Sequence, residues 1–204
     1  MTRLYLRQRV RTLLNDMKGE RFPDSYINDM LNEGLKSLCH RVLLLESKDS
    51  SLTYSSTYDG FALPSDFIKV KSLQWESTDN YNVVLEPNSL EYIYNKRNDY
   101  KTISEEEAGS LNPAVYTIHN GYIIIDSTTQ TSPVLYYYKY DTALSLDTSE
   151  PSIDSEYHKY LVDYAVYNLD PGNIDARSRW NYGIRDMIGG KKQTNRIRAN
   201  YQAL

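Results

Sequence analysis

Near both ends of the chain, apolar residues recur at steps of three and four, the spacing of one face of an α-helix. The longest such run consists of Ile27, Leu31, Leu35, Leu38, Val42 and Leu45. We expect a first helix from Thr2 to about Met17, capped by Thr2, with its arginines mostly away from the apolar face. A second helix is expected after Pro23, with Asp24 or Ser25 as its cap.

Helical spacing returns beyond Pro151. The expected inward positions of this helix are Ile153, Tyr157, Leu161, Tyr164, Ala165 and Leu169. Asn173 is expected to cap a last helix, which Gly189-Gly190 closes. Gly34 lies inside the second helix, where a glycine costs roughly 1 kcal/mol relative to alanine. We therefore expect another stretch of backbone to approach closely at Gly34.

Between the helical parts the apolar spacing changes to two, which is typical of β-strands. Strands are predicted at residues 52–57, 67–75, 81–85 and 134–140. Asn120-Gly121 is the pair that a type I′ turn prefers, so a hairpin should place Ile118 opposite Ile123. A helical turn is expected at residues 90–94 and an exposed loop at residues 96–112. We predict a small antiparallel barrel or sandwich of five to seven strands.

Together these patterns predict an α+β chain with an inserted domain. Residues 1–46 and 151–188 should form a helical body of about four helices, and residues 47–150 an inserted β domain. Residues 189–204 should form an extended C-terminal arm, basic and without acidic residues. The arm has too few apolar groups to fold alone.

Composition adds two features. The chain has 20 tyrosines against 3 phenylalanines and 2 tryptophans. Tyrosine suits surfaces that are wet at one time and buried at another, although a tyrosine-biased genome explains the number equally well. Residues 1–45 carry 8 basic and 5 acidic side chains, residues 46–150 carry 7 and 16, and residues 151–204 carry 8 and 6. This division fits either electrostatic docking of unlike surfaces or ordinary solvated faces.

The residues that most often carry chemistry are few and scattered. His40, His119 and His158 occur in separate elements without other metal ligands at suitable spacing, so we expect no metal site. Cys39 is expected in the core, while His40 and His158 are expected to be solvated. Glu105-Glu106-Glu107 fits a solvated loop better than a cation site. No phosphate-binding, dinucleotide-binding or hydrolase motif is present, so we expect no catalytic residue, no cofactor and no enzyme activity.

The layout of helical ends, β insertion and coreless arm indicates an assembly protein that contacts several neighbours. The alternative is a nucleic-acid-binding module that uses the basic C-terminal arm, with tyrosines stacking on bases. Against this alternative, the strand-rich segment is acidic and its tyrosines are not interleaved with arginine or lysine. A globular protein with an unrecognised site is a third possibility. Membrane insertion is not expected, because no apolar run approaches ~18 residues.

Several stretches of sequence carry a resemblance to a known family. They are Phe22-Pro23-Asp24 with Leu31-Asn32-Glu33-Gly34, residues 63–73, Pro113-Ala114-Val115-Tyr116 with residues 120–125, and residues 157–165. In this order the chain resembles the head-to-tail adaptor (connector) proteins of tailed bacteriophages, in the form that has a β domain inserted between helical halves. The resemblance spans most of the chain.

The resemblance implies a structural virion protein of the head-tail junction, assembled in the host cytoplasm. It implies a homo-oligomeric ring, usually a dodecamer, that docks on the portal protein and forms part of the channel through which DNA passes as cargo. The arm would reach into the portal, and the β insertion would contact other neck or tail proteins. By position, the candidate portal contacts are Lys191, Lys192, Arg196, Ile197, Arg198, Tyr201 and Leu204.

Overall fold

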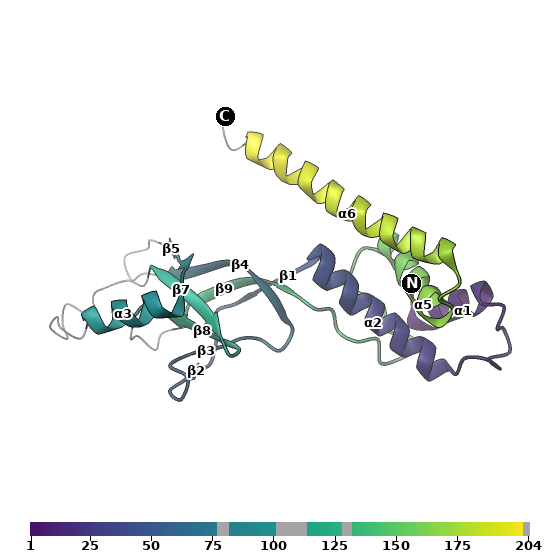
Figure 1. The fold of residues 1–204 in the computed structure, drawn as a ribbon, viewed down its shortest axis with the longest axis horizontal. Helices are drawn as coiled ribbons and strands as arrows, with labels where there is room; N and C mark the ends of the chain where they lie inside the picture. The colour runs from purple at the N-terminus through teal and green to yellow at the C-terminus, as the bar shows by residue number, and fades with distance from the viewer. Residues whose placement is uncertain (77–81, 101–113, 128–131, 202–204) are drawn as a thin grey trace. The chain divides into compact units, whose positions relative to one another are not determined.

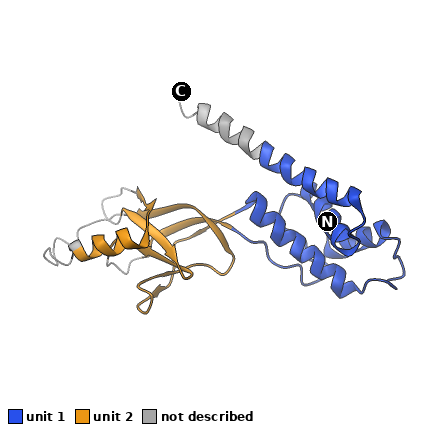
Figure 2. Cartoon of the chain, in the orientation of Figure 1, with its two compact units in different colours: residues 1–45, 139–204 blue, residues 46–138 orange. Residues whose placement is uncertain are grey.

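The computed structural model describes residues 1–76, 82–100, 114–127 and 132–201. The chain divides into two compact units, shown in different colours in Figure 2. Unit 1 consists of residues 1–45 and 139–204, and unit 2 of residues 46–138. Unit 1 is helical, whereas unit 2 contains the strands and one helix (Figure 1). The described part of the chain is therefore α+β.

Unit 1 is built around a central helix. Its described helices are α1 (Arg3–Leu13), α2 (Asp24–Val42), the short 3-10 helix η1 (Ser155–Tyr157), α5 (His158–Leu169) and α6 (Ile174–Tyr201). Helix α5 packs against α1, α2 and α6, and α2 also packs against α1 and α6. Thr2 caps α1 as expected, because its Oγ1 accepts a hydrogen bond from the Tyr5 N–H at 3.3 Å. The expected cap of α2 is wrong: Pro23 occupies the N-cap position, and Asp24 is the first helical residue.

Helix α2 buries the predicted apolar run as far as Val42. The helix ends there because Leu43 adopts the left-handed backbone conformation, with φ 56°. Leu45 was expected to continue the helix, but it is the first residue of strand β1. At the start of α6, Asn173 is the predicted cap, since its Oδ1 accepts from the Ala176 N–H at 3.0 Å.

Helix α6 does not end at Gly189-Gly190, so the predicted helix stop is wrong. The helix continues through both glycines to Tyr201. A glycine that ends a helix usually adopts the left-handed conformation. Among the described glycines only Gly19 and Gly121 have a positive φ. The residues that follow are rich in lysine, glutamine and arginine, which favour helix. The arm expected to be extended over residues 189–204 is therefore helical as far as Tyr201.

Gly34 marks a close approach, but of an aromatic ring and not of another backbone. A Cβ atom at Gly34 would lie 2.9 Å from Cδ1 and 3.3 Å from Cβ of Tyr164 on α5. Gly183 on α6 plays the same part, because a Cβ there would lie 2.4 Å from Cε1 of Tyr160. Two tyrosines of α5 thus pack against glycines of the neighbouring helices, Tyr164 against α2 and Tyr160 against α6.

Gly34→Ala is expected to lower the free energy of unfolding by about 1 kcal/mol, as measured by urea denaturation followed by circular dichroism. The added methyl meets the fixed inner atoms of Tyr164, and overpacking of this kind outweighs the gain in helix propensity. Gly189→Ala is the matched control. It places the same methyl in open space within a helix and is expected to raise the free energy of unfolding by roughly 0.5–1 kcal/mol. Equal effects of the two substitutions would contradict the close contact with Tyr164.

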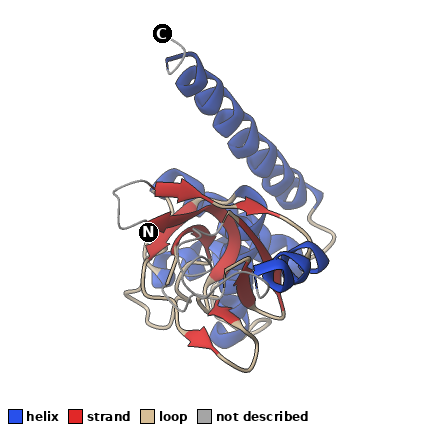
Figure 3. Ribbon diagram, turned by 90° about the vertical axis from the view of Figure 1, so that its left-hand side faces the viewer, coloured by secondary structure: helices blue, strands red, loops and turns tan. Residues whose placement is uncertain are grey.

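Unit 2 contains two sheets, whose strands are red in Figure 3. One sheet has the order β1 (Leu45–Asp49), β9 (Val134–Lys139), β4 (Phe67–Glu76) and β5 (Asn82–Val84). The other has the order β2 (Tyr54–Ser55), β3 (Gly60–Ala62), β8 (Tyr122–Ile125), β7 (Val115–His119) and β6 (Glu86–Pro87). Neither sheet closes into a barrel in the described part of the chain, so the barrel alternative is wrong. The sheets are also not wholly antiparallel, since β6 pairs in parallel with β7.

The hairpin of β7 and β8 has the predicted register. Ile118 lies opposite Ile123 and His119 opposite Tyr122, with Asn120 and Gly121 in the turn. Both turn residues have positive φ, 49° and 81°, as a type I′ turn requires. The register places Ile123 in the core that both sheets share. Leu73 and Trp75 of β4 and Leu135 of β9 belong to the same core.

Helix α3 (Leu90–Tyr100) corrects two local expectations. It is longer than the helical turn predicted at residues 90–94, and its last residues replace the first part of the loop predicted at residues 96–112. The remainder of that loop, including Glu105-Glu106-Glu107, lies outside the described residues. The strand expected at residues 52–57 is reduced to β2, because a turn follows Ser55.

Candidate functional site

Six of the seven residues proposed from the sequence as portal contacts lie on one element, helix α6. Lys191, Lys192, Arg196, Ile197, Arg198 and Tyr201 lie on the last turns of α6, and Leu204 lies outside the described residues. The last buried side chains described on α6 are Ile184 and Met187. Gly189, which follows them, is exposed. The candidate contacts therefore begin where the described burial of α6 in unit 1 ends.

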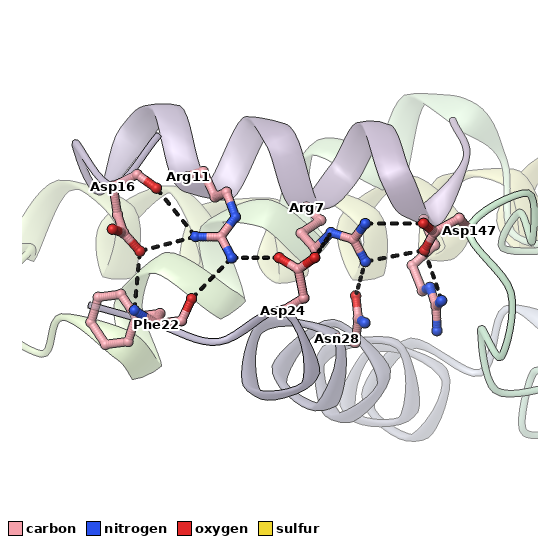
Figure 4. A network of polar contacts seen from close by, with 8 residues as sticks. Arg7, Arg11, Asp16, Phe22, Asp24, Asn28 and Asp147 are labelled. Atoms are coloured by element: carbon pink, nitrogen blue, oxygen red, sulfur yellow. Dashed lines mark hydrogen bonds and ion pairs between the residues drawn. The ribbon is translucent and has the colours of Figure 1, made fainter. Parts of the chain in front are cut away.

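A row of arginines on α1 is the most extensive polar feature described in unit 1 (Figure 4). Arg3, Arg7 and Arg11 are four residues apart and therefore line one side of the helix. Arg7 donates from Nη1 and Nη2 to the two carboxylate oxygens of Asp147 at 3.1 and 3.0 Å. Arg3 donates to Asp147 at 2.8 Å. These contacts join the start of α1 to the segment that returns from unit 2.

The other end of the arginine row holds the turn between α1 and α2. Arg11 contacts the carboxylates of both Asp16 and Asp24, and it donates to the carbonyl oxygen of Phe22 at 2.9 Å. The Asp16 carboxylate also accepts from the backbone N–H groups of Arg21 at 3.1 Å and Phe22 at 3.0 Å. These N–H donors, helped by Arg11, hold the pKa of Asp16 below its usual range. The turn is thus fixed by charge-assisted hydrogen bonds.

The arginine row was not found by sequence reasoning, which expected these side chains mostly away from the buried face. In the structure Arg7 is only 8% exposed. Hydrogen bonds from Arg7 and Arg3 lower the pKa of Asp147, which supports a charged pairing. The signal available in the sequence was the repeat of arginine at every fourth position, but its partner Asp147 lies 140 residues beyond Arg7.

His158 is buried, at 2% exposed, so the expectation of a solvated histidine is wrong. Its Nδ1 lies 2.9 Å from the amino group of Met1, and its Nε2 lies 3.0 Å from the carbonyl oxygen of Ile153. An imidazole that accepts at Nδ1 and donates at Nε2 is neutral. Burial lowers the pKa of His158, which favours the same neutral form. The histidine is a structural link between the first residue and α5.

Among the described residues, the other candidate reactive groups are Cys39, His40 and His119. Cys39 is buried as expected, and burial raises the pKa of its thiol to about 11, so the reactive thiolate is disfavoured. His40 is exposed and stacks on Tyr140, while His119 is exposed beside the hairpin turn. Within the described ranges, no group of three or more His, Cys, Asp or Glu side chains could hold a metal ion. Nor is any described helix long and apolar enough to cross a membrane.

A groove of about 420 Å³ runs between α5 and α6. It is lined by Lys159, Tyr160, Asp163, Ser178, Arg179 and Tyr182. Asp163 is buried and accepts a hydrogen bond from Nε of Arg179 at 2.7 Å. Burial raises the pKa of Asp163, while the nearby charges of Arg179, Lys159 and Arg9 oppose that rise. The charged side chains that line the groove are two cations, Lys159 and Arg179, and one carboxylate, Asp163, so the lining has an excess of one positive charge.

In unit 2, one buried arginine joins three elements. Arg97 of α3 donates from Nε to the carbonyl oxygen of Ile125 on β8 at 2.8 Å. Its Nη1 contacts the carboxylate of Asp59, in the turn between β2 and β3. Asp59 also accepts from the Tyr54 hydroxyl at 2.6 Å. The surface nearby carries a stacked pair of tyrosines, Tyr58 and Tyr122, with ring centroids 4.3 Å apart.

Comparison with known proteins gives one family. The family described as SU10 adaptor protein matches residues 1–203, which is nearly the whole chain. No curated protein matches the sequence. The family match covers both units and the helical C-terminal segment, so it concerns the complete arrangement and not a single motif.

Proposed function

The chain belongs to the SU10 adaptor protein family, and from this premise we propose that it joins the head of a tailed bacteriophage to its tail. It is a phage structural adaptor. In the proposed assembly, copies form a ring, with a dodecamer expected, that docks on the portal protein and surrounds part of the DNA channel. Unit 2 contacts other neck or tail proteins.

The observation that carries the portal-docking proposal is the course of α6. The helix continues to Tyr201, beyond its last described buried side chain, Met187. The segment after Gly190 carries Lys191, Lys192, Arg196 and Arg198 and no acidic residue. A segment that is already helical loses less conformational entropy on binding than an unstructured arm. This supports a basic helical end that inserts into the portal.

In a ring, each of these contacts is repeated once for every copy, so the ring as a whole binds the portal more tightly than a single copy does. Once one helical end has bound, the others in the ring are held close to their own sites, so their effective concentration is high. Modest contacts by Lys191, Arg196 and their neighbours therefore add up to a durable joint. In this mechanism the protein works through contact area and repetition, and catalysis plays no part.

A chain that ends at Gly189 is expected to keep its fold and to lose most of its attachment to the portal. We expect the apparent affinity to fall by at least roughly tenfold, because the proposed basic contacts are removed from every copy. Native mass spectrometry of each chain, mixed with the portal ring of the same virus, measures this loss. The full chain should add a complete ring of copies.

Circular dichroism and thermal unfolding of the shortened chain provide the control. An unchanged unfolding transition with lost attachment supports the proposal. Unfolding of the shortened chain would mean that the segment belongs to the core, and undiminished attachment would place the portal contacts elsewhere. Salt-sensitive DNA binding by the full chain, without any portal association, would instead favour a nucleic-acid-binding function for the basic segment.

A further inference from the structure

The outer face of α2 has a charge opposite in sign to that of the α5–α6 groove. Tyr26, Asp29 and Glu33 are spaced by three and four residues and so lie on one side of the helix. All three are exposed, with Tyr26 at 50%. Neither carboxylate forms an ion pair within the described chain. No lysine or arginine occurs from Asp24 to Leu35, so this part of the face is acidic around Tyr26. On the next turns Glu33 also lines a hollow with Lys36 and Arg41, so the acidic part of the face ends at Glu33.

The groove offers the complementary surface. Lys159 and Arg179 line it, Arg9 lies near its buried carboxylate, and Asp163 is already paired with Arg179. Tyr182, at 69% exposed, forms part of the wall and leaves apolar surface uncovered. A partner for this groove should therefore supply acidic side chains and one aromatic or apolar side chain.

The two surfaces lie on opposite sides of unit 1. Helix α2 turns Ile27, Leu31 and Leu38 inward and the acidic face outward. Helix α5 turns Leu161 and Ala165 inward and lines the groove with residues from its other side. Because α2 and α5 pack against each other, their outward faces point away from one another. Surfaces that match but lie on opposite sides make a head-to-tail contact, which generates rings or filaments and not closed dimers.

We propose that the acidic face of α2 in one copy docks into the α5–α6 groove of the next copy. Tyr26 enters beside Tyr182, while Asp29 and Glu33 meet Lys159 and Arg179. This contact rests on the proposed ring and specifies which surfaces of unit 1 build it. The proposed contact uses neither the end of α6 nor any residue of unit 2.

The first test exchanges charges across the contact. Glu33→Lys and Lys159→Glu, each alone, are expected to weaken self-association by on the order of tenfold. A chain with both substitutions should recover most of the association, because unlike charges meet again. Analytical ultracentrifugation at low salt measures self-association, and native mass spectrometry counts copies on the portal ring. Thermal unfolding of each variant verifies that unit 1 remains folded.

The second test uses disulfide crosslinking. A chain carrying both Tyr26→Cys and Tyr182→Cys is expected to give a ladder of dimers, trimers and larger species on oxidation, since a head-to-tail contact repeats from copy to copy. Each single variant should give no ladder. The buried Cys39 does not interfere. Tyr94→Cys combined with Tyr182→Cys is the matched control, because Tyr94 is an exposed tyrosine of unit 2.

The outcomes separate this contact from the adaptor function. The contact would be overturned if the charge-exchange variants still formed complete rings on the portal and the double-cysteine chain gave no ladder. The adaptor function would then remain in place. Failure of the unmodified chain to form any ring on the portal would overturn the adaptor function, and the contact with it. The contact would be established by three results together. Self-association weakens in each single charge exchange, it recovers in the chain with both exchanges, and a crosslinked ladder forms only with cysteines at positions 26 and 182.

Discussion

Arg97→Met is expected to lower the free energy of unfolding of unit 2 by about 3 kcal/mol. Arg97 is only 5% exposed, and it supplies hydrogen bonds to the Ile125 carbonyl and to Asp59. Methionine has a similar length but no donor, so the carbonyl oxygen stays buried without this partner. The Asp59 carboxylate is half exposed and regains water, which keeps the expected loss below that of a fully buried ion pair.

The measurement uses the two tryptophans of the chain, one in each unit. Trp75 lies in the core of unit 2 and Trp180 in unit 1, so Trp180→Phe leaves a chain whose fluorescence reports on unit 2. Urea unfolding in this background gives the free energy. Lys69→Met, at an exposed position of β4, is the control and should change stability by less than about 0.5 kcal/mol. A loss no larger than that of the control would mean that Arg97 does not anchor α3.

Arg7→Met is expected to lower the free energy of unfolding of unit 1 by about 2 kcal/mol. The substitution removes the paired hydrogen bonds to Asp147 and the ion pair with Asp24, and with them the link between α1 and the segment that returns from unit 2. Both carboxylates are half exposed and regain water, so the expected loss is smaller than for Arg97.

Fluorescence of Trp180 in a Trp75→Phe chain measures this second effect. Arg9→Met is the matched control, since Arg9 lies on the same helix but is exposed and should change stability by less than about 0.5 kcal/mol. If Arg7→Met and Arg9→Met lowered the free energy of unfolding by the same amount, the arginine row would not be a stabilising network.

The features that sequence reasoning predicted correctly are those decided by nearby residues. The Asn120-Gly121 turn sets the register of its own hairpin, and the apolar spacing of α2 identifies its buried side. Thr2 and Asn173 act as caps because their partners lie three residues away. In each case the interacting groups are close together in the chain, so a short pattern contains both of them.

The features that were missed depend on distant or weak signals. The role of Arg7 depends on Asp147, and the burial of His158 depends on the chain start, 157 residues away. The glycine pair of α6 is a weak signal, because two glycines cost a helix only about 2 kcal/mol in total. The candidate portal contacts from Lys191 to Leu204 stay a prediction, since their partner is another protein.

The path of the chain into and out of unit 2 has a consequence for how such proteins diversify. Strands β1 and β9, which begin and end the insertion, are neighbours in one sheet. Neighbouring strands lie about 4.8 Å apart, so the chain leaves unit 2 beside the point where it enters. Evolution can therefore enlarge, shrink or exchange the whole insertion while the helices keep the same connection. In the proposed assembly, recognition of new tail components would change in this module without a change in the helices proposed to bind neighbouring copies.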